Sequence, residues 1–312
     1  MKQLVILSGK GGTGKTTITA AFIRLADAKA YADCDVDAPN LHLITARNTE
    51  PRRKDYYGMP KALIDTDKCV KCGMCRLYCR FSAIYGKEKL MVDTFACEGC
   101  GVCEAVCPAG AIKLQQTVSG ELMLYADDNK TFSTARLKTG SGNTGLLVSE
   151  VKKQLKETAE PDTDVSFIDV SFIDVSFIDV SFIDGSPGIG CPVIATLSGA
   201  DMALIVAEPT VSGISDMERI IKTARKFNIK TRVCVNKYDI NIANTEKIEK
   251  FCMQEGLTFT GRIPFDKEAV KAVNRGLTVI DTECAAGKAV LHVFRKTMSI
   301  LTKESDGTGE WF

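Results

Sequence analysis

The sequence predicts an α/β fold in which a parallel sheet, covered by helices on both faces, is interrupted by a smaller cysteine-rich segment. Three observations support this prediction. Short apolar runs of strand length alternate with stretches of helical length. The first apolar run ends in a glycine-rich loop. Eight of the 13 cysteines lie between Cys69 and Cys107.

The composition is that of a globular chain without a strong overall charge. Its 312 residues are 45% hydrophobic, and its formal net charge is +1. This length accommodates two domains, or one large domain with an insert. So small a net charge gives no reason to expect nucleic acid as a partner. We expect no membrane span, because no run of about 18 apolar residues occurs. We expect a cytoplasmic protein, because the N-terminal run lacks the features of a signal peptide.

The predicted strands and helices follow one another in pairs. A buried strand at 3–8 precedes a helix at 15–27, and a second strand covers 29–35. From about residue 61 to 115, cysteines, glycines and short connections replace this pattern. We therefore divide the chain into a main domain (1–60 and 116–312) and an insert (61–115). The later elements are strands at 202–208, 230–237 and 257–264, and helices at 213–227, 244–255, 266–275 and 285–302.

The pentapeptide VSFID occurs four times in succession, at 165–169, 170–174, 175–179 and 180–184. One strand of this length would span roughly 66 Å, far more than ordinary strands. An odd period would also exchange the buried face from copy to copy. We expect a single copy, the last, to form a sheet strand. The repeat is a tandem duplication or a sequence error, and an intact mass lighter by whole pentapeptides would indicate the error.

Residues 9–17, GKGGTGKTT, have the features of a phosphate-binding loop. Glycines let the backbone turn tightly and direct N–H groups at phosphate oxygens. Lys15 can reach the β- and γ-phosphates, Thr16 can bind Mg²⁺, and the following helix points its N-terminus at the anion. A glycine-rich turn without a ligand is the alternative, but the coincidence of strand, loop, Lys-Thr pair and helix favours nucleotide binding. The predicted contacts are Gly9, Lys10, Gly11, Gly12, Thr13, Gly14, Lys15, Thr16 and Thr17.

Lys10 places a second lysine near the start of this loop. With it, the loop resembles the deviant Walker A motif of the MinD/ParA, Mrp and nitrogenase iron-protein ATPases. In that superfamily two nucleotide-bound subunits meet face to face, and this lysine reaches the partner's nucleotide. The resemblance implies an ATP-dependent homodimer in which Lys10 and Lys15 are both catalytic. Taken alone, Lys10 would be read as a solvated loop charge.

The acidic stretch DCDVDAPN (33–40) resembles switch I of the same superfamily. The resemblance implies that Asp35 is a catalytic residue that positions the hydrolytic water. It also implies that Asp33 and Asp37 bind Mg²⁺ or its water shell. Three acids in a solvated turn are the alternative, but their position directly after a predicted strand favours a function.

DGSPGIG (184–190) resembles the Walker B and switch II segment. This resemblance implies that Asp184 lies close to Mg²⁺ and that the Gly188 N–H senses the γ-phosphate. Asn236, which ends a predicted strand, resembles the residue that contacts the base. The stretch NKYD (236–239) also matches the guanine-specificity pattern of GTPases. Lys10 favours ATP.

Two cysteine motifs share the spacing C-x-x-C-x-x-C-x-x-x-C. Such motifs supply three thiolates to one cubane cluster and a fourth to the other. Zinc is the alternative, but it needs only four ligands and usually pairs separated C-x-x-C knuckles. A disulfide scaffold is disfavoured in so long a chain. The spacing predicts one [4Fe–4S] cluster on Cys69, Cys72, Cys75 and Cys107, and a second on Cys97, Cys100, Cys103 and Cys79.

Residues 61–115 therefore resemble bacterial two-cluster ferredoxins. The motif departs from that family at Arg80, where proline is common, whereas Pro108 keeps it in the second motif. Arg80 could raise the potential of a cluster, dock an acidic partner, or be a tolerated surface charge. With the loop at 9–17, the chain resembles the MinD-superfamily ATPases that contain an inserted ferredoxin domain. The fold that this resemblance implies is a parallel-sheet P-loop NTPase with an inserted bacterial ferredoxin-like domain.

Cys191 follows Asp184 by seven residues. That spacing resembles the nitrogenase iron protein, in which a cysteine after switch II ligates a cluster shared by two subunits. That protein needs a second cysteine per subunit, and the matching stretch here, 140–145, has Asn143 instead. We therefore favour an unligated thiol at Cys191 over an extra cluster ligand.

Three functions remain open. The leading one is an ATPase that couples its nucleotide cycle to electron transfer, or to iron–sulfur or metal-cofactor assembly, with an unidentified redox or cluster-transfer protein as partner. The alternative is a MinD/ParA-like interaction switch with structural or redox-sensing clusters. An ATP-dependent amidoligase is disfavoured, because no glutaminase domain is present. The predicted cofactors are ATP, Mg²⁺ and two [4Fe–4S] clusters.

Overall fold

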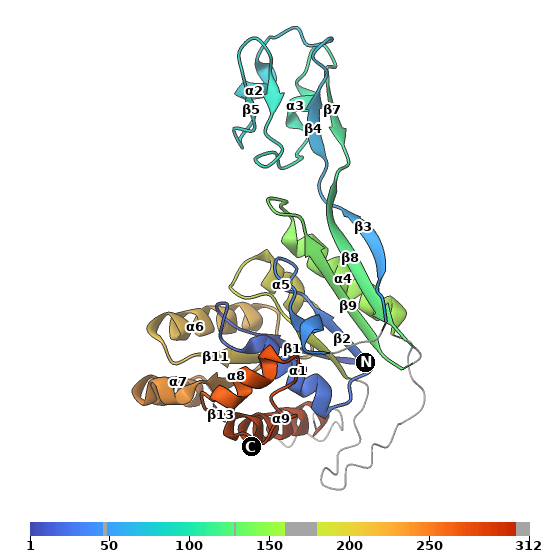
Figure 1. Ribbon diagram of the computed structural model, residues 1–312. Coiled ribbons are helices and arrows are strands. Elements are labelled where there is room, and N and C mark those ends of the chain that lie inside the picture. Colours follow the sequence, from blue (N-terminus) through green and yellow to red (C-terminus); the bar gives the residue numbers. More distant parts are fainter. Residues whose placement is uncertain (46–48, 128, 160–179, 304–312) are drawn as a thin grey trace.

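The computed structural model describes residues 1–45, 49–127, 129–159 and 180–303, which are organised around one nine-stranded sheet (Figure 1). The strand order is β13-β12-β11-β1-β10-β2-β9-β8-β3, and all neighbours from β13 to β9 run parallel. This confirms the predicted α/β fold with a mostly parallel sheet. The strands in the centre and on the β13 side are β1 (Lys2–Leu7), β2 (Ala30–Asp33), β10 (Val180–Asp184), β11 (Met202–Ala207), β12 (Lys230–Asn236) and β13 (Thr258–Ile263).

Helices cover both faces of the sheet because its central strands are apolar on both sides. In β1, Val5 and Leu7 pack into one core, whereas Leu4 and Ile6 pack into the other. The first core is covered by α4 (Thr144–Thr158), α5 (Cys191–Leu197), α6 (Val211–Lys226) and α7 (Ile242–Gln254). The second is covered by α1 (Lys15–Leu25), the short η1 (Leu41–Leu43), α8 (Lys267–Asn274) and α9 (Ala285–Lys303).

One edge of the sheet differs from the all-parallel prediction. Here β9 (Thr131–Leu137) pairs antiparallel with β8 (Val118–Ala126), which pairs antiparallel with β3 (Arg52–Tyr57). The chain leaves the main domain along β3 and returns along β8, so these two strands must run in opposite directions. Strand β3 was not predicted, because its sequence RRKDYY is mostly exposed and has no apolar run.

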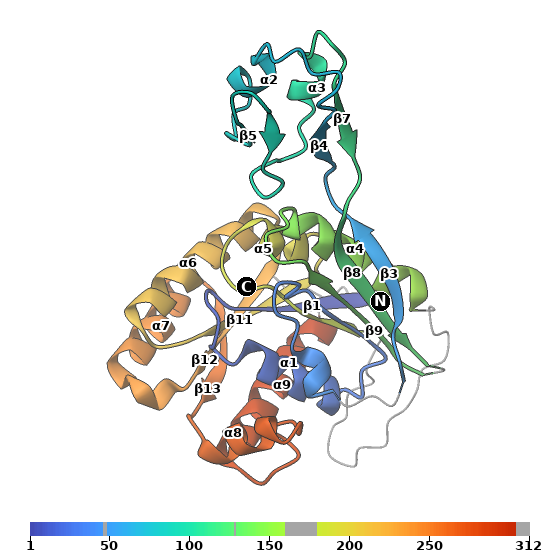
Figure 2. The ribbon, with the colours of Figure 1, turned by 45° about the horizontal axis from the view of Figure 1, so that its top comes forward.

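The cysteine-rich segment projects from the far end of the β3–β8 ribbon, as Figures 1 and 2 both show. Its base is an antiparallel pair in which Lys61 of β4 lies opposite Gln115 of β7. Its core is small and consists of Ala62, Cys75, Ala83, Ile84, Leu90, Cys97 and Ile112. Its elements are β4 (Lys61–Ile64), α2 (Met74–Leu77), β5 (Ile84–Tyr85), β6 (Met91–Val92), α3 (Val102–Ala105) and β7 (Ile112–Gln115).

The last VSFID copy is the sheet strand β10, which pairs with β1 on one side and β2 on the other. The first three copies, at 165–179, lie outside the described residues. The predicted strand–helix pairs of the C-terminal half are present within a few residues of their predicted bounds, with the 3-10 turn η2 (Tyr238–Ile240) added after β12. In the described part of the chain, no helix has the length and apolar character needed to cross a membrane.

Candidate functional site

The residues that carry chemistry gather at the carboxyl ends of the central strands. Strand β1 leads into the glycine-rich loop, β10 ends at Asp184, and β2 ends at Asp33. Asp184 and Asp33 lie opposite each other in the register of β10 and β2. Ligands of open parallel sheets bind at this edge. The fold therefore brings three separate sequence motifs to one place.

The loop between β1 and α1 is closely packed by residues from distant segments. Gly14 has a φ of 88°, and a Cβ added there would lie 2.3 Å from Nδ2 of Asn236. A Cβ on Gly9 would lie 2.1 Å from Cβ of Asp216. Both positions therefore require glycine. Asn236 donates from Nδ2 to the Thr13 carbonyl at 2.7 Å, which ties the end of β12 to the loop.

Lys15, Thr16 and Asp184 form one hydrogen-bonded group. Lys15 Nζ donates to Oδ1 of Asp184 at 2.8 Å, and the Thr16 hydroxyl donates to Oδ2 at 2.7 Å. The Thr19 hydroxyl also donates to Oδ1 of Asp184, at 2.9 Å. Thr19 was not predicted, although it lies four residues after Lys15 on the same helix, a spacing that places both on one face.

Lys15, Asp184 and the nearby Asp33 are buried together, so two carboxyl groups surround one ammonium group. Burial alone would lower the pKa of Lys15, but the carboxylates of Asp184, Asp33 and Asp35 raise it, so the ammonium stays charged. Burial, together with the charge of Asp184, raises the pKa of Asp33 to about 7. A divalent cation would relieve this crowding of carboxylates. The donor set therefore fits Mg²⁺.

The switch I acids have different surroundings. Asp33 is fully buried, and its carboxylate accepts backbone N–H bonds from Asp35, Asn40 and Leu41 at 2.9–3.0 Å. Asp35 is half-buried, and burial is the main cause that raises its pKa. Asp37 is exposed. Asp33 thus organises the loop that presents the other two acids.

Lys10 is bound to residues that follow β11. Its Nζ lies 2.6 Å from Oε2 of Glu208 and 3.2 Å from the Thr210 hydroxyl. Lys237 Nζ pairs with the other oxygen, Oε1 of Glu208, at 3.0 Å and donates to the Gly12 carbonyl at 2.8 Å. Burial alone would raise the pKa of Glu208, but the two ammonium groups lower it. Glu208 and Lys237 were missed from the sequence, although each directly follows a strand at this edge.

A cavity of about 280 Å³ opens beside the glycine loop. Gly12, Gly14 and Asn236 line one side of it, and Phe265 on the segment after β13 lines another. The Asp239 carboxylate, which would read guanine in a GTPase, accepts a hydrogen bond from the Phe265 N–H at 2.8 Å. Its use in this loop contact weakens the guanine interpretation. Thr17, a predicted phosphate contact, also lines this cavity.

Switch II and Cys191 lie on the other side of the phosphate loop. Gly188 has a φ of 94°, and its N–H donates to the Ser8 carbonyl at 3.1 Å. Contact between this N–H and a γ-phosphate therefore requires that bond to break. Cys191 is exposed and begins α5. A Cβ added at Gly145 would lie 3.2 Å from Cβ of Cys191, so the thiol stands beside the 140–145 stretch that holds Asn143.

The insert is built from two similar halves that are offset by 28 residues. Asp65 accepts hydrogen bonds from the backbone two and three residues later, and Asp93 does the same. The Asp65 N–H donates to the Ala111 carbonyl, and the Asp93 N–H donates to the Ala83 carbonyl, each at 2.7 Å. Each half continues into a short helix, α2 or α3, that begins after a glycine with positive φ.

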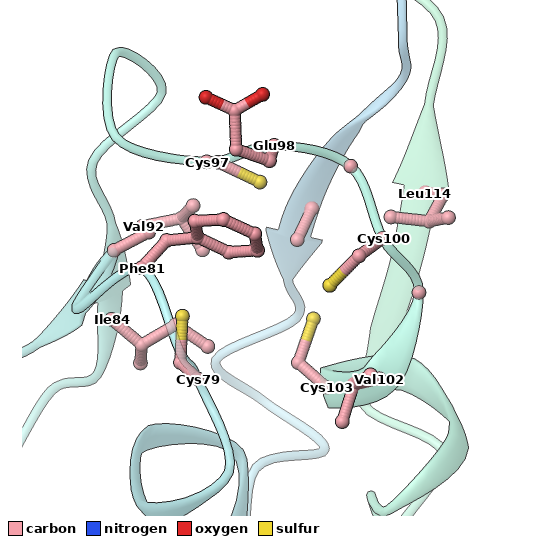
Figure 3. A pocket seen from close by; sticks show the side chains of 14 residues that line it. Cys79, Phe81, Ile84, Val92, Cys97, Glu98, Cys100, Val102, Cys103 and Leu114 are labelled. Carbon is pink, nitrogen blue, oxygen red and sulfur yellow. The ribbon is translucent and has the colours of Figure 1, made fainter.

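This duplication brings the predicted ligand sets together. Cys97, Cys100 and Cys103 line one cavity with Cys79 from the other half. Figure 3 shows the sulfur atoms of these four residues directed toward a shared space, whereas the Glu98 carboxylate points away from it. In the other set, burial raises the pKa of Cys75, and the neighbouring thiols Cys69, Cys107 and Cys72 add to the effect.

Within the described residues, no group of three or more Cys, His, Asp or Glu side chains is close enough to hold a single metal ion. A tetrahedral zinc ion with Zn–S bonds of about 2.3 Å would need sulfur atoms about 3.8 Å apart. A cubane cluster is larger and takes sulfur atoms that are farther apart. The structure therefore places these four cysteines around one cavity, and among the described residues it shows no group arranged to hold a metal ion.

The glycine loop, the buried Lys15–Asp184 pair and the parallel sheet define a P-loop nucleotide-binding protein. Residues 4–279 match the family model described as CobQ/CobB/MinD/ParA nucleotide binding domain. The chain belongs to this family and is an ATPase.

Relatives and solved structures agree with this membership. The uncharacterized protein MJ0578 of Methanocaldococcus jannaschii is 28% identical over 94% of this chain and 95% of its own length. The septum site-determining protein MinD of Helicobacter pylori is 29% identical over 32% of this chain and 41% of its own. The structure of MinD from Pyrococcus horikoshii in complex with Mg-ADP aligns over 98% of this chain and 99% of its own, with a TM-score of 0.54 and 15% identity. That likeness shows a shared fold.

Proposed function

We propose that this ATPase is an interaction switch: ATP and Mg²⁺ bring two copies together face to face, and the resulting dimer controls the binding of a partner protein. The position of Lys10 carries this proposal. Its ammonium is held by Glu208 and Thr210 at the mouth of the site and not by its own phosphate loop. A lysine so placed is available to a nucleotide on a second copy once the Glu208 contact is exchanged.

The remaining residues of the site have compatible roles. Lys15 binds the β- and γ-phosphates, while Thr16 and Asp184 hold Mg²⁺, consistent with their shared hydrogen bond. Asp33 and Asp37 contribute to the surroundings of the metal, Asp35 orients the attacking water, and Gly188 exchanges its bond to Ser8 for one to the γ-phosphate. The base lies in the cavity beside Asn236. The residues that cradle the phosphates are Gly9, Lys10, Gly11, Gly12, Thr13, Gly14 and Thr17.

We also propose that the insert, 61–115, holds two [4Fe–4S] clusters with the crossed ligation predicted from the spacing. Two observations support it: the 28-residue duplication, and the cavity that Cys79 shares with three cysteines of the other half. Such clusters supply one-electron redox chemistry and structural cross-links. The pairing of Lys61 with Gln115 supports the proposed domain boundaries.

A second function, coupling of the nucleotide cycle to electron transfer, has one observation in its favour. Phe95, just before the second cysteine motif, and Glu98 within it approach the main domain at Gly140 and Gly142. That loop leads into α4, whose first turn contacts Cys191 beside switch II. Nucleotide and clusters are thus linked by a short path through contacting segments.

The dimer proposal is tested by measuring molar mass in solution with Mg-ATP, Mg-ADP or no nucleotide. We expect dimers with ATP alone, and monomers for Lys10→Ala with every nucleotide. Lys271→Ala serves as the matched control, because Lys271 is a surface lysine paired with Glu268 on α8. Monomers at all ATP concentrations, or dimers of Lys10→Ala equal to the wild type, would contradict the dimer proposal.

The cluster proposal is tested by iron and sulfide analysis after anaerobic reconstitution. About eight irons per chain are expected, and stoichiometric zinc without iron would overturn it.

A further inference from the structure

The two cysteine motifs of the insert have the same spacing but opposite charge. We call residues 69–80 the first arm and residues 97–108 the second arm. The first arm contains Lys71, Arg76 and Arg80 and no acidic residue. The second arm contains Glu98 and Glu104 and no basic residue. Arg76 and Glu104 occupy equivalent positions in the duplication, so the charge is reversed at the same structural site.

The first arm also exposes more apolar surface than the second. Val70 is 66% exposed, Leu77 77% and Tyr78 50%, and Met74 is exposed as well. In the second arm, Val102 at 40% is the one large apolar residue among the exposed ones described. Arg76 Nη1 donates to the Gly86 carbonyl at 2.7 Å, which holds its guanidinium against the turn between β5 and β6. The first arm thus combines apolar side chains with fixed positive charge.

The segment around the start of the second arm approaches the main domain at Gly140 and Gly142. The short helices α2 and α3 both lie on the part of the insert farther from the main sheet (Figures 1 and 2). The Phe95 ring packs against Gly140, and the Glu98 carboxylate approaches Gly142. The equivalent of Phe95 in the first half is Asp67, and both residues are exposed, Phe95 at 70%. The glycines of the 140–142 loop thus meet residues of the second half of the insert.

We propose that the first arm is the docking surface for a small acidic electron-carrier protein. This inference rests on the proposed clusters. Cys69, Cys72, Cys75 and Cys107 would hold the cluster that accepts the electron. The reduced carrier would lose one electron, and the oxidised cluster would gain it. Cys72 is exposed, so one of the thiols that would hold this cluster lies at the surface of the arm.

The chemistry of the arm favours this kind of partner. Aromatic residues, methionine and arginine are enriched in protein interfaces. Electron-transfer partners usually meet through interfaces of small area. Complementary charge sets the rate and orientation of such encounters more than their affinity. An α2 of four residues is too short to lie in a lipid surface as an amphipathic helix. The positive charge is therefore better matched by an acidic protein than by a membrane.

The test uses the full-length protein with its clusters reconstituted, and an acidic plant-type ferredoxin as the probe. Binding is measured by titration calorimetry at low and high salt. We expect Arg76→Glu combined with Arg80→Glu to weaken binding at least tenfold at low salt, and Glu104→Gln to change it less than twofold. The exchange variant, Arg76→Glu with Glu104→Arg, keeps the net charge and should lose binding as the double variant does. Leu77→Ala should weaken binding without changing its salt dependence.

Iron content and the visible spectrum of each variant show whether the clusters remain. Clusters that are present without ferredoxin binding would overturn this inference and leave the cluster proposal standing. Unchanged binding by the exchange variant would overturn it as well, and so would equal binding of basic cytochrome c or of anionic phospholipid vesicles. A wild-type protein that takes up no iron would overturn the cluster proposal, and this inference with it.

Discussion

The main domain and the insert hold their functional residues in different ways. The main domain buries large side chains on both faces of its sheet, including Phe22, Phe132, Phe182 and Phe294. The insert has seven residues in its core, and two of them, Cys75 and Cys97, are predicted cluster ligands. A segment of this size rarely folds on its own core alone. The nucleotide site is therefore shaped by protein packing, whereas we expect the insert to depend on what its cysteines bind.

The largest expected effect is unfolding of the insert when its cysteines lose their ligand, while the main domain stays folded by its own packing. Removing iron with a chelator, or replacing Cys100 by Ala, should unfold much of the insert, because ligand binding and folding are coupled. The main domain should remain folded. Limited proteolysis with mass spectrometry should then show cleavage within 61–115 at a rate raised by tenfold or more, with the remainder intact. Cys252→Ala is the matched control, because this buried cysteine lies in the core of the main domain. Equal protease resistance with and without iron would mean that the insert does not need clusters to fold.

The next prediction compares two substitutions in the nucleotide site, one expected to abolish nucleotide binding and one expected to slow ATP hydrolysis. Lys15→Ala should abolish detectable nucleotide binding, since it removes the buried cation that we propose binds the phosphates. Asp35→Ala should leave the affinity for ATP within a few fold and slow hydrolysis on the order of 100-fold, because a group that orients water acts mainly in the transition state. Fluorescent-nucleotide titration and phosphate release measure the two quantities. Loss of ATP affinity in Asp35→Ala would instead assign Asp35 to binding.

A smaller effect concerns the contact that holds Lys10. Glu208→Gln removes the charge that Lys10 and Lys237 share, so both lysines are released more easily. The dimer should therefore form at about two- to fivefold lower ATP concentration, in line with roughly 0.5–1 kcal/mol for a partly exposed ion pair. Glu255→Gln is the control, because its partner Arg225 lies on the surface away from the site. A dimer that needs more ATP in Glu208→Gln would show that Glu208 supports the active arrangement and does not restrain Lys10.

Residues that belong to sequence motifs could be predicted, whereas residues that act through tertiary contacts could not. The phosphate loop, Asp184 and the predicted cysteine sets belong to motifs with short, regular spacings. Such spacings can be recognised in the amino-acid sequence. Glu208 and Thr19 act through tertiary contacts, and neither belongs to a motif that marks it. Strand β3 has a charged sequence and exists because it pairs with β8, so no local pattern could predict it. The VSFID repeat shows the converse: four identical copies cannot all be the same strand, and in the described part of the chain the copy at 180–184 forms β10.

The finest test asks whether the two regions communicate. The path runs from Phe95 to Gly140, then along the start of α4 to Cys191 and switch II. In the middle of α4, Lys152 donates from Nζ to the Thr196 carbonyl of α5 at 2.7 Å, so the two helices are joined at a second point. Movement of switch II would therefore reach the loop on which Phe95 rests.

If nucleotide shifts the potential of a cluster, cluster reduction must shift ATP affinity by the same factor. A shift of about 60 mV in a one-electron couple corresponds to tenfold, or about 1.4 kcal/mol. Charge alone is a weak source of such a shift, because salt screens charges beyond about 8 Å. We therefore expect contact at Phe95 to carry the effect. Anaerobic ATP titrations of oxidised and reduced protein should differ by threefold to tenfold in the wild type. The difference should disappear in Phe95→Ala and persist in Leu63→Ala, another exposed apolar residue of the insert. Equal affinities in the wild-type protein would mean that the clusters and the ATPase are thermodynamically independent, and the interaction switch would then carry the insert as a passive module.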